Sequence, residues 1–194
     1  MCLSWKVALF AALSELSVLG CSASAPPPAK EPPKPCEALP PELEILATDR
    51  VNATAAGEGR PVQLRIYQLK ADTALQSASF EEIWQNDASV LEKDLVKVDE
   101  QTVYPGRSSR LKIELTGGAD KLALVALFRE PQGKDWFVTY DLDVTAPPPP
   151  CPTKPPTITV FLDRMQIQDG QGREASELGK SEASDANASE VGAN

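Results

Sequence analysis

The sequence has 194 residues, of which 42% are hydrophobic and 24% are charged, and this suffices for one folding unit with a core. Its formal net charge of −9 argues against nucleic acid as a partner, because binding to a phosphate backbone needs clustered Lys and Arg. The absence of histidine removes the commonest general base and the commonest metal ligand. We therefore expect no metal, no cofactor and no catalytic residues, and the composition argues against an enzyme.

The N-terminal segment has the features of a lipoprotein signal peptide. Residues 7–19 are mostly apolar, follow Lys6, and are too few for a comfortable bilayer span. They lead into Gly20 and Cys21, and a small residue directly before a cysteine at this place resembles the lipobox that the lipoprotein signal peptidase cuts. We expect residues 1–20 to be removed and the thiol of Cys21 to be lipidated. An ordinary secretory signal cleaved nearby, or an uncleaved anchor, would also leave the domain outside the cytoplasm.

Residues 21–42 join this lipidation site to the globular part. Ser22 stands where an aspartate usually retains lipoproteins in the inner membrane, so we expect attachment to the outer membrane through the acyl chains of Cys21. Proline dominates residues 25–41, and such a run favours an extended conformation that cannot pack a core. We expect a stalk that holds the domain clear of the membrane, although a merely tolerated linker fits the residues equally well.

Alternation of apolar residues with period two dominates the middle of the chain and predicts short β-strands. Val62, Leu64 and Ile66, for example, fall on one face of a strand. Residues 122–128 are apolar on both faces, which is typical of a central strand covered on both sides. Seven such strands suggest an all-β sandwich over residues 43–165. The seven candidates are residues 43–52, 62–69, 95–98, 111–115, 121–129, 136–142 and 157–162.

Residues 71–86 have helical spacing and predict a helical insertion between the second and third strands. Asp72 or Ser79 offers an N-cap, and Ser79 with Glu82 three residues later forms a capping box, so the helix could be split at residues 77–79. Its apolar side chains, which are expected to cover the second face of the central strand, are Leu75, Phe80, Ile83 and Trp84.

Two cysteines remain once residues 1–20 are removed and Cys21 is acylated. Cys36 lies in the stalk and Cys151 lies in a second proline run, residues 146–156. An even pair outside the cytoplasm suggests a disulfide, and this requires that the first and last strands begin near each other. Two free or intermolecular thiols are the alternative. Neither cysteine has the spacing of a zinc site.

Several parts of the chain are more specific than a general β-pattern: RPVQLRIYQL (60–69), SFEEIW (79–84), VYPG (103–106), LVALFR (124–129) and Trp136. Together they resemble the TssJ family of type VI secretion system lipoproteins. The resemblance covers about residues 44–163. It implies a transthyretin-like β-sandwich that is held in the outer membrane by acyl chains and binds the periplasmic domain of an inner-membrane protein of the IcmF or TssM type. It also implies a docking subunit without enzymatic activity and without a small-molecule substrate.

In this family the loop between the first two strands contributes to the contact with the partner. By position the loop corresponds here to residues Ala53, Thr54, Ala55, Ala56, Gly57, Glu58 and Gly59. Its small, weakly packing residues suit an exposed loop, and a plain connection between strands fits them equally well.

Other functions remain open at this level. A solitary periplasmic lipoprotein that binds a ligand or acts like a chaperone could use the same sandwich. An enzyme would need an acid–base pair in a pocket. The carboxylates of this chain fit solvated helix and strand faces instead: Glu81, Glu82, Asp94, Asp99 and Glu100. Residues 166–194, rich in Ser, Ala, Glu and Gly from 170 onward, are expected to form a disordered tail.

Overall fold

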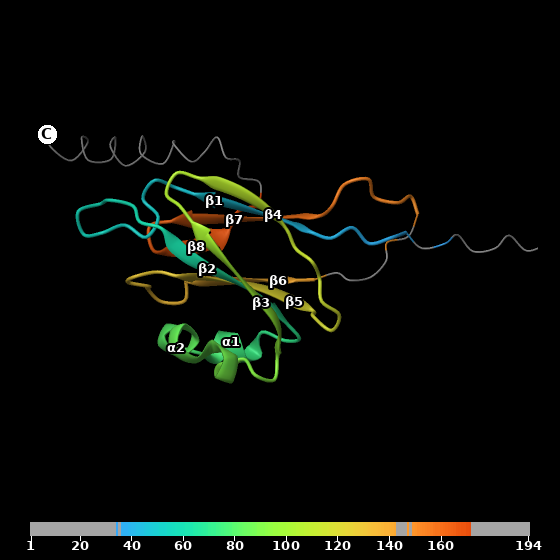
Figure 1. The fold of residues 1–194 in the computed structure, drawn as a ribbon, viewed down its shortest axis with the longest axis horizontal. Helices are drawn as coiled ribbons and strands as arrows, with labels where there is room; N and C mark the ends of the chain where they lie inside the picture. Colours follow the sequence, from blue (N-terminus) through green and yellow to red (C-terminus); the bar gives the residue numbers. More distant parts are fainter. Residues whose placement is uncertain (1–33, 35, 143–146, 148, 172–194) are drawn as a thin grey trace, which may run out of the picture. The chain divides into compact units, whose positions relative to one another are not determined.

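The structure is a computed structural model that describes residues 34, 36–142, 147 and 149–171. The predicted signal peptide, the lipidation site Cys21 and the tail from residue 172 lie outside the described residues. Two four-stranded sheets face each other, and two short helices lie on the outer side of one of them (Figure 1). The expected all-β sandwich with a helical insertion after the second strand is confirmed.

The first sheet has the strand order β4-β1-β7-β8. Its central strands, β1 (Glu42–Ala47) and β7 (Thr157–Asp163), run parallel, with Glu42 opposite Thr157. The edge strands β4 (Ser108–Lys112) and β8 (Gln166–Asp169) pair antiparallel with them. Because a parallel pair begins at one end of the sheet, β1 and β7 start side by side.

The second sheet is antiparallel throughout, in the order β3-β2-β5-β6. Its strands are β3 (Leu95–Val103), β2 (Val62–Leu69), β5 (Lys121–Leu127) and β6 (Phe137–Asp141). Five consecutive residues of β5, from Leu122 to Ala126, are buried. One face of β5 packs between the sheets and the other lies under the helices, which explains its unbroken apolar run.

The helical insertion consists of α1 (Thr73–Ser77) and α2 (Phe80–Val90). The break falls at Ser79, whose side chain accepts a hydrogen bond from the amide of Glu82 while the Glu82 carboxylate accepts one from the amide of Ser79. This capping box and the split are confirmed. Neither helix in the described part of the chain is long and apolar enough to cross a membrane.

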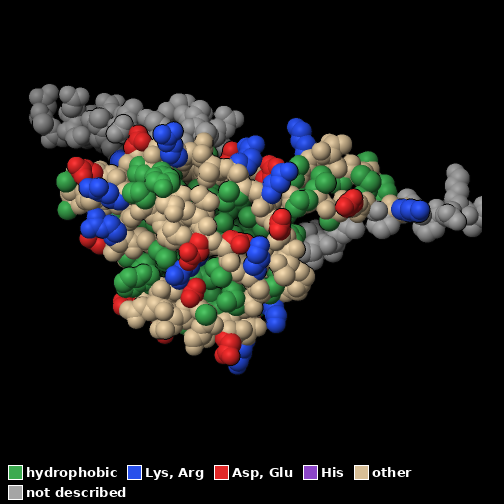
Figure 2. Space-filling view, in the orientation of Figure 1, with side chains coloured by type: hydrophobic (Ala, Val, Ile, Leu, Met, Phe, Trp, Pro, Cys, Tyr) green, Lys and Arg blue, Asp and Glu red, His purple; other side chains and the backbone are tan. Residues whose placement is uncertain are grey.

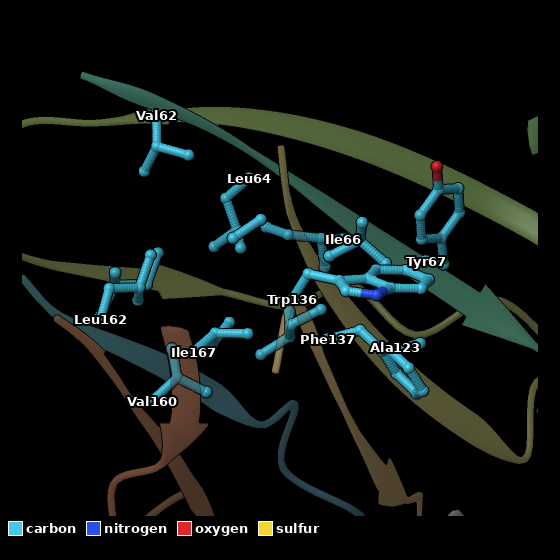
Figure 3. Close-up of a cluster of buried hydrophobic side chains, with 14 of the residues drawn as sticks. Val62, Leu64, Ile66, Tyr67, Ala123, Trp136, Phe137, Val160, Leu162 and Ile167 are labelled. Atoms are coloured by element: carbon cyan, nitrogen blue, oxygen red, sulfur yellow. The ribbon is translucent and has the colours of Figure 1, made fainter. Parts of the chain in front are cut away.

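The core has two layers, one between the sheets and one beneath the helices. Val62, Leu64 and Ile66 point between the sheets, toward Leu162 of β7, as the alternation predicts (Figure 3). Beneath the helices, the buried ring of Trp136 packs edge-on against Phe80, with 5.5 Å between ring centroids. A tilted contact with Phe137, at 4.6 Å, completes this aromatic group.

The structure differs from the expectations in several details. The expected sandwich of about seven strands is present with an eighth strand, because Gln166–Asp169 form β8 and bury Ile167, so the ordered domain extends beyond residue 165 into the expected disordered tail. The strand expected at residues 111–115 is β4, at Ser108–Lys112. Trp84 is 53% exposed instead of packed on the sheet, since Ile83 occupies the buried side of α2. β3 continues to Val103, because an edge strand with polar residues gives no apolar alternation.

A disulfide joins Cys36 to Cys151, with 5.3 Å between their Cα atoms. It ties together the segments that enter β1 and β7. The amide of Cys36 also donates to the carbonyl of Pro147 at 3.1 Å, and the amide of Glu42 donates to that of Pro156 at 2.9 Å. We call this side of the sandwich the disulfide end.

The disulfide bridges residues 115 apart in sequence, so its loss should lower the free energy of unfolding. Loop-closure entropy sets an upper value of about 4–5 kcal/mol for a loop of this length. We expect the double variant Cys36→Ser, Cys151→Ser to unfold at a clearly lower urea concentration than the oxidised protein. If the variant and the reduced wild type unfold at the same urea concentration as the oxidised protein, this closure contributes nothing to stability.

Candidate docking surface

Four connections meet at the end of the sandwich opposite the disulfide (Figure 1). They are the β1–β2 loop (48–61), the β3–β4 turn (104–107), the β5–β6 loop (128–136) and the β7–β8 turn (164–165). Backbone hydrogen bonds connect the first of them to two others: the amide of Asn52 donates to Arg164, and the amide of Gly106 donates to Thr48. We call this side the loop end.

Asn52, through its buried side chain and its backbone amide, ties three of these connections together. It is 4% exposed and adopts a positive φ of 50°, a conformation that asparagine tolerates better than most residues. Its amide group donates to the carbonyl of Pro61 at 2.9 Å, and its side-chain oxygen accepts from the amide of Arg129 at 2.9 Å. Its own backbone amide donates to the carbonyl of Arg164 at 2.6 Å.

Asp163, at the end of β7, holds the segment that leaves β1. One carboxylate oxygen accepts a hydrogen bond from the Thr48 hydroxyl at 2.6 Å, and the other pairs with the guanidinium of Arg50 at 3.3 Å. Both charged side chains are only about a quarter exposed or less, so solvent screens this pair less than an exterior one. The two central strands are thus tied at the loop end as well as at the disulfide end.

Asp49 fills a narrow seam between the β1–β2 loop and the β3–β4 turn. A Cβ atom at Gly59 would collide with the backbone oxygen of Asp49, and one at Gly106 would collide with its carboxylate. Gly106 also has a positive φ of 65°. The two glycines are therefore needed for the close approach, and the loop and the turn form one rigid unit.

The predicted partner-binding residues form the tip above this base. Within the tip, the amide of Gly57 donates to the carbonyl of Thr54, and the amide of Thr54 donates to that of Glu58, both at 2.8 Å. Residues 55–58 are exposed, while Ala53, Thr54 and Gly59 are half-buried. The ion pair between Glu58 and Arg60 at 2.8 Å lies in solvent and adds little stability. The loop therefore presents small side chains and accessible backbone on a fixed base.

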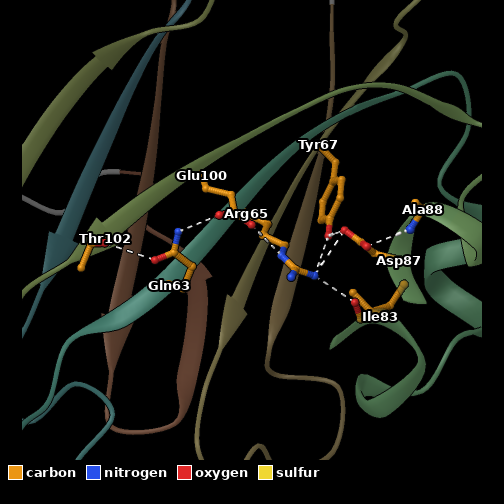
Figure 4. A network of polar contacts seen from close by, with 8 residues as sticks. All are labelled: Gln63, Arg65, Tyr67, Ile83, Asp87, Ala88, Glu100 and Thr102. Atoms are coloured by element: carbon orange, nitrogen blue, oxygen red, sulfur yellow. Dashed lines mark hydrogen bonds and ion pairs between the residues drawn. The ribbon is translucent and has the colours of Figure 1, made fainter. Parts of the chain in front are cut away.

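A polar network on the outer face of the second sheet has a structural role (Figure 4). The buried Tyr67 hydroxyl donates to Asp87 of α2 at 2.6 Å. Arg65 pairs with Asp87 at 3.2 Å and with Glu100 of β3 at 3.1 Å, and it donates to the carbonyl of Ile83 at 3.1 Å. Burial, followed by the contact with Asp87, raises the pKa of Tyr67 far above its usual value, so it remains a neutral donor. This network fastens α2 to the sheet.

Sequence reasoning did not find this network, although polar residues at alternate positions of β2 are its signal. Gln63 donates to Glu100 at 3.2 Å and accepts from Thr102 at 3.1 Å, which extends the network along the edge of the sheet. Across the described residues, no group of three His, Cys, Asp or Glu side chains is arranged to hold a metal ion.

The fold is a two-sheet sandwich domain with four connections held together at its loop end. Comparison with known families gives a specific result. The family model described as "Type VI secretion lipoprotein, VasD, EvfM, TssJ, VC_A0113" matches residues 40–165. The chain therefore belongs to the type VI secretion lipoproteins of the TssJ family, as the sequence segments indicate. This family and the solved structures described next support a role in the type VI secretion membrane complex.

Solved structures are similar over most of their length. The lipoprotein TssJ1 from Pseudomonas aeruginosa is 26% identical, with a TM-score of 0.56, covering 70% of this chain and 95% of that one. A chain in a structure of the T6SS protein TssM C-terminal domain (869–1107) from EAEC is 25% identical, with a TM-score of 0.55 and coverage of 66% and 98%. A chain of a type VI membrane complex, at 24% identity, TM-score 0.59 and coverage of 69% and 98%, shares the fold. No curated protein matches the chain.

Replacing Asn52 should loosen the loop end. Asn52→Ala removes two side-chain hydrogen bonds from a buried site and strains the positive φ, so we expect a loss of about 2–3 kcal/mol in the free energy of unfolding. Asn52→Gly restores the backbone freedom and should be about 1 kcal/mol less harmful. Urea unfolding measures both, and wild-type stability in the alanine variant would contradict the role given to this side chain.

Proposed function

We propose that this chain is an outer-membrane lipoprotein subunit of the type VI secretion membrane complex that docks the periplasmic domain of an inner-membrane IcmF/TssM-type protein. In this proposal residues 1–20 are the signal peptide, Cys21 carries the acyl chains and residues 21–42 are the stalk. Residues 53–59 contact the partner. The role is mechanical and requires no catalytic residue.

One observation supports the proposal: Cys36, where the proposed stalk would join the domain, and the β1–β2 loop lie at opposite ends of β1. The chain from Cys21 enters at the disulfide end through Cys36, and β1 leads directly from there to the β1–β2 loop. The roughly 15 residues between the two cysteines reach about 50 Å at most. A tether of this reach leaves enough room for the loop end to face away from the membrane.

The identity of the partner is supported by similarity. A chain 25% identical to this one occurs in the structure of the TssM C-terminal domain, and another of similar fold occurs in a type VI membrane complex. Tethering raises the effective concentration of the loop near a partner that is itself fixed in a membrane, so moderate affinity suffices for assembly.

The lipid anchor is tested by Cys21→Ala in the full chain. We expect the variant to leave the outer-membrane fraction, because no acyl chain then holds it. It should still bind the purified partner domain in solution, since the loop end is unchanged. Membrane fractionation and pull-down give the two readouts, and continued outer-membrane attachment would rule out acylation of Cys21 as the anchor.

The docking loop is tested by Ala56→Glu, which places a large charged side chain at an exposed position of the tip. We expect the dissociation constant for the partner's periplasmic domain to rise at least tenfold, equivalent to about 1.4 kcal/mol. Gly117→Glu is the matched control, because Gly117 lies in open space between β4 and β5, near the disulfide end. Equal binding by both variants would exclude the loop from the contact.

A further inference from the structure

Three large hydrophobic side chains are exposed among the described residues: Trp84 at 53%, Val98 at 40% and Tyr104 at 57%. Trp84 lies on α2, on the outer side of the second sheet, and Val98 lies in the middle of β3, so neither belongs to the β1–β2 loop or the β3–β4 turn. Tyr104 lies in the β3–β4 turn, beside the β1–β2 loop. Tyrosine and arginine are enriched among the residues that dominate protein–protein binding energy.

The turn that carries Tyr104 is fixed to the docking loop. The amide of Gly106 donates to the carbonyl of Thr48 at 3.1 Å, and the amide of Ala47 donates to that of Arg107 at 3.1 Å. A Cβ atom at Gly59 would approach the side chain of Pro105 to 3.2 Å, so the two segments are in close contact. A partner that touches residues 55–58 therefore meets Tyr104 on the same rigid base, with little entropy lost on ordering it.

Arg107 gives this surface a charge that the described chain does not neutralise. Arg60, Arg65 and Arg110 each pair with a carboxylate, whereas Arg107 is exposed and has no carboxylate partner in the part of the chain that the structure describes. Among the described residues, Arg107 is thus an unneutralised positive charge in a chain whose formal net charge is −9. A guanidinium binds a carboxylate through two parallel hydrogen bonds, so Arg107 is suited to an acidic side chain of a partner.

Tyr104 and Arg107 border one hollow. Its volume is about 590 Å³, and residues 101–105 and 107–109, from the end of β3 and the start of β4, line it. Figure 2 shows hydrophobic, basic and acidic side chains side by side at the end of this face that carries the β1–β2 loop. The hollow thus continues the loop surface along the open side between the two sheets.

We propose that Tyr104 and Arg107 extend the docking loop into one binding surface, with Tyr104 as its apolar anchor and Arg107 as the site for a carboxylate. This rests on the proposed function. The occupant is the same periplasmic domain that contacts residues 53–59, and the chemistry it must offer is an apolar recess bordered by Asp or Glu. Tyr104 enters that recess, and Arg107 pairs with its border.

Matched pairs of variants test the surface with the full chain and the purified periplasmic domain. Tyr104→Ala should raise the dissociation constant at least tenfold, whereas Trp84→Ala, which removes an equally exposed aromatic ring from α2, should change it less than twofold. Arg107→Glu should weaken binding at least tenfold and reduce its sensitivity to salt, whereas Lys93→Glu, an exposed charge reversal remote from the loop end, should not. Unchanged thermal unfolding midpoints establish that the variants are folded.

Each remaining outcome contradicts a specific statement. If Ala56→Glu weakens binding and Tyr104→Ala does not, the loop docks without the surface proposed here, and the proposed function stands. If the wild-type chain does not bind the periplasmic domain at all, the proposed function and this inference are both wrong. Equal losses from Tyr104→Ala and Trp84→Ala would place the anchor elsewhere. Self-association of the wild type that Tyr104→Ala abolishes would identify a second copy of this chain as the occupant and overturn the proposal.

Discussion

The parallel pairing of β1 with β7 is the constraint on which the rest of the structure depends. These strands lie at the centre of one sheet, in register from Glu42 opposite Thr157 to Ala47 opposite Leu162. A disulfide closes the pair where both strands begin, and Asp163 closes it where they end. The disulfide end and the loop end are therefore held about 20 Å apart, the length of six extended residues.

This arrangement suits a subunit that is held at one end and grips a partner at the other. In the proposed function, tension enters at Cys36 and leaves at the β1–β2 loop, so it runs along β1. Because the hydrogen bonds of β1 to β4 and β7 lie across that direction, they are strained together rather than opened one at a time. The ties at Cys151 and Asp163 pass part of the tension to β7, and the rigid loop end keeps its position.

Local signals predicted the parts of the fold that depend on nearby residues. β2 was predicted to its exact bounds, because the alternation of Val62, Leu64 and Ile66 reports the face that packs between the sheets. The capping box of Ser79 and Glu82 likewise acts within one turn. β8 was missed, because four residues with one buried side chain, Ile167, carry no pattern. β8 forms because it pairs with the edge of β7, and the residues of β8 alone do not show that this edge is available.

The proposed docking surface likewise has one part that local sequence predicts and one part that only the folded structure shows. Residues 53–59 could be assigned to the β1–β2 loop from the sequence, because the loop between the first two strands is defined by chain order. Their contact with a partner comes from the family resemblance and stays a prediction. Pro105 and Gly106 indicate a turn, but the sequence does not show that this turn lies against the β1–β2 loop. The folded chain shows that the Asp49 carboxylate lies where a side chain at position 106 would be, so only glycine allows the turn to pack this closely against the loop. With Val103 buried before it and Gly106 fixed after it, Tyr104 has no interior position to occupy, and its exposed ring beside the loop is a consequence of that packing.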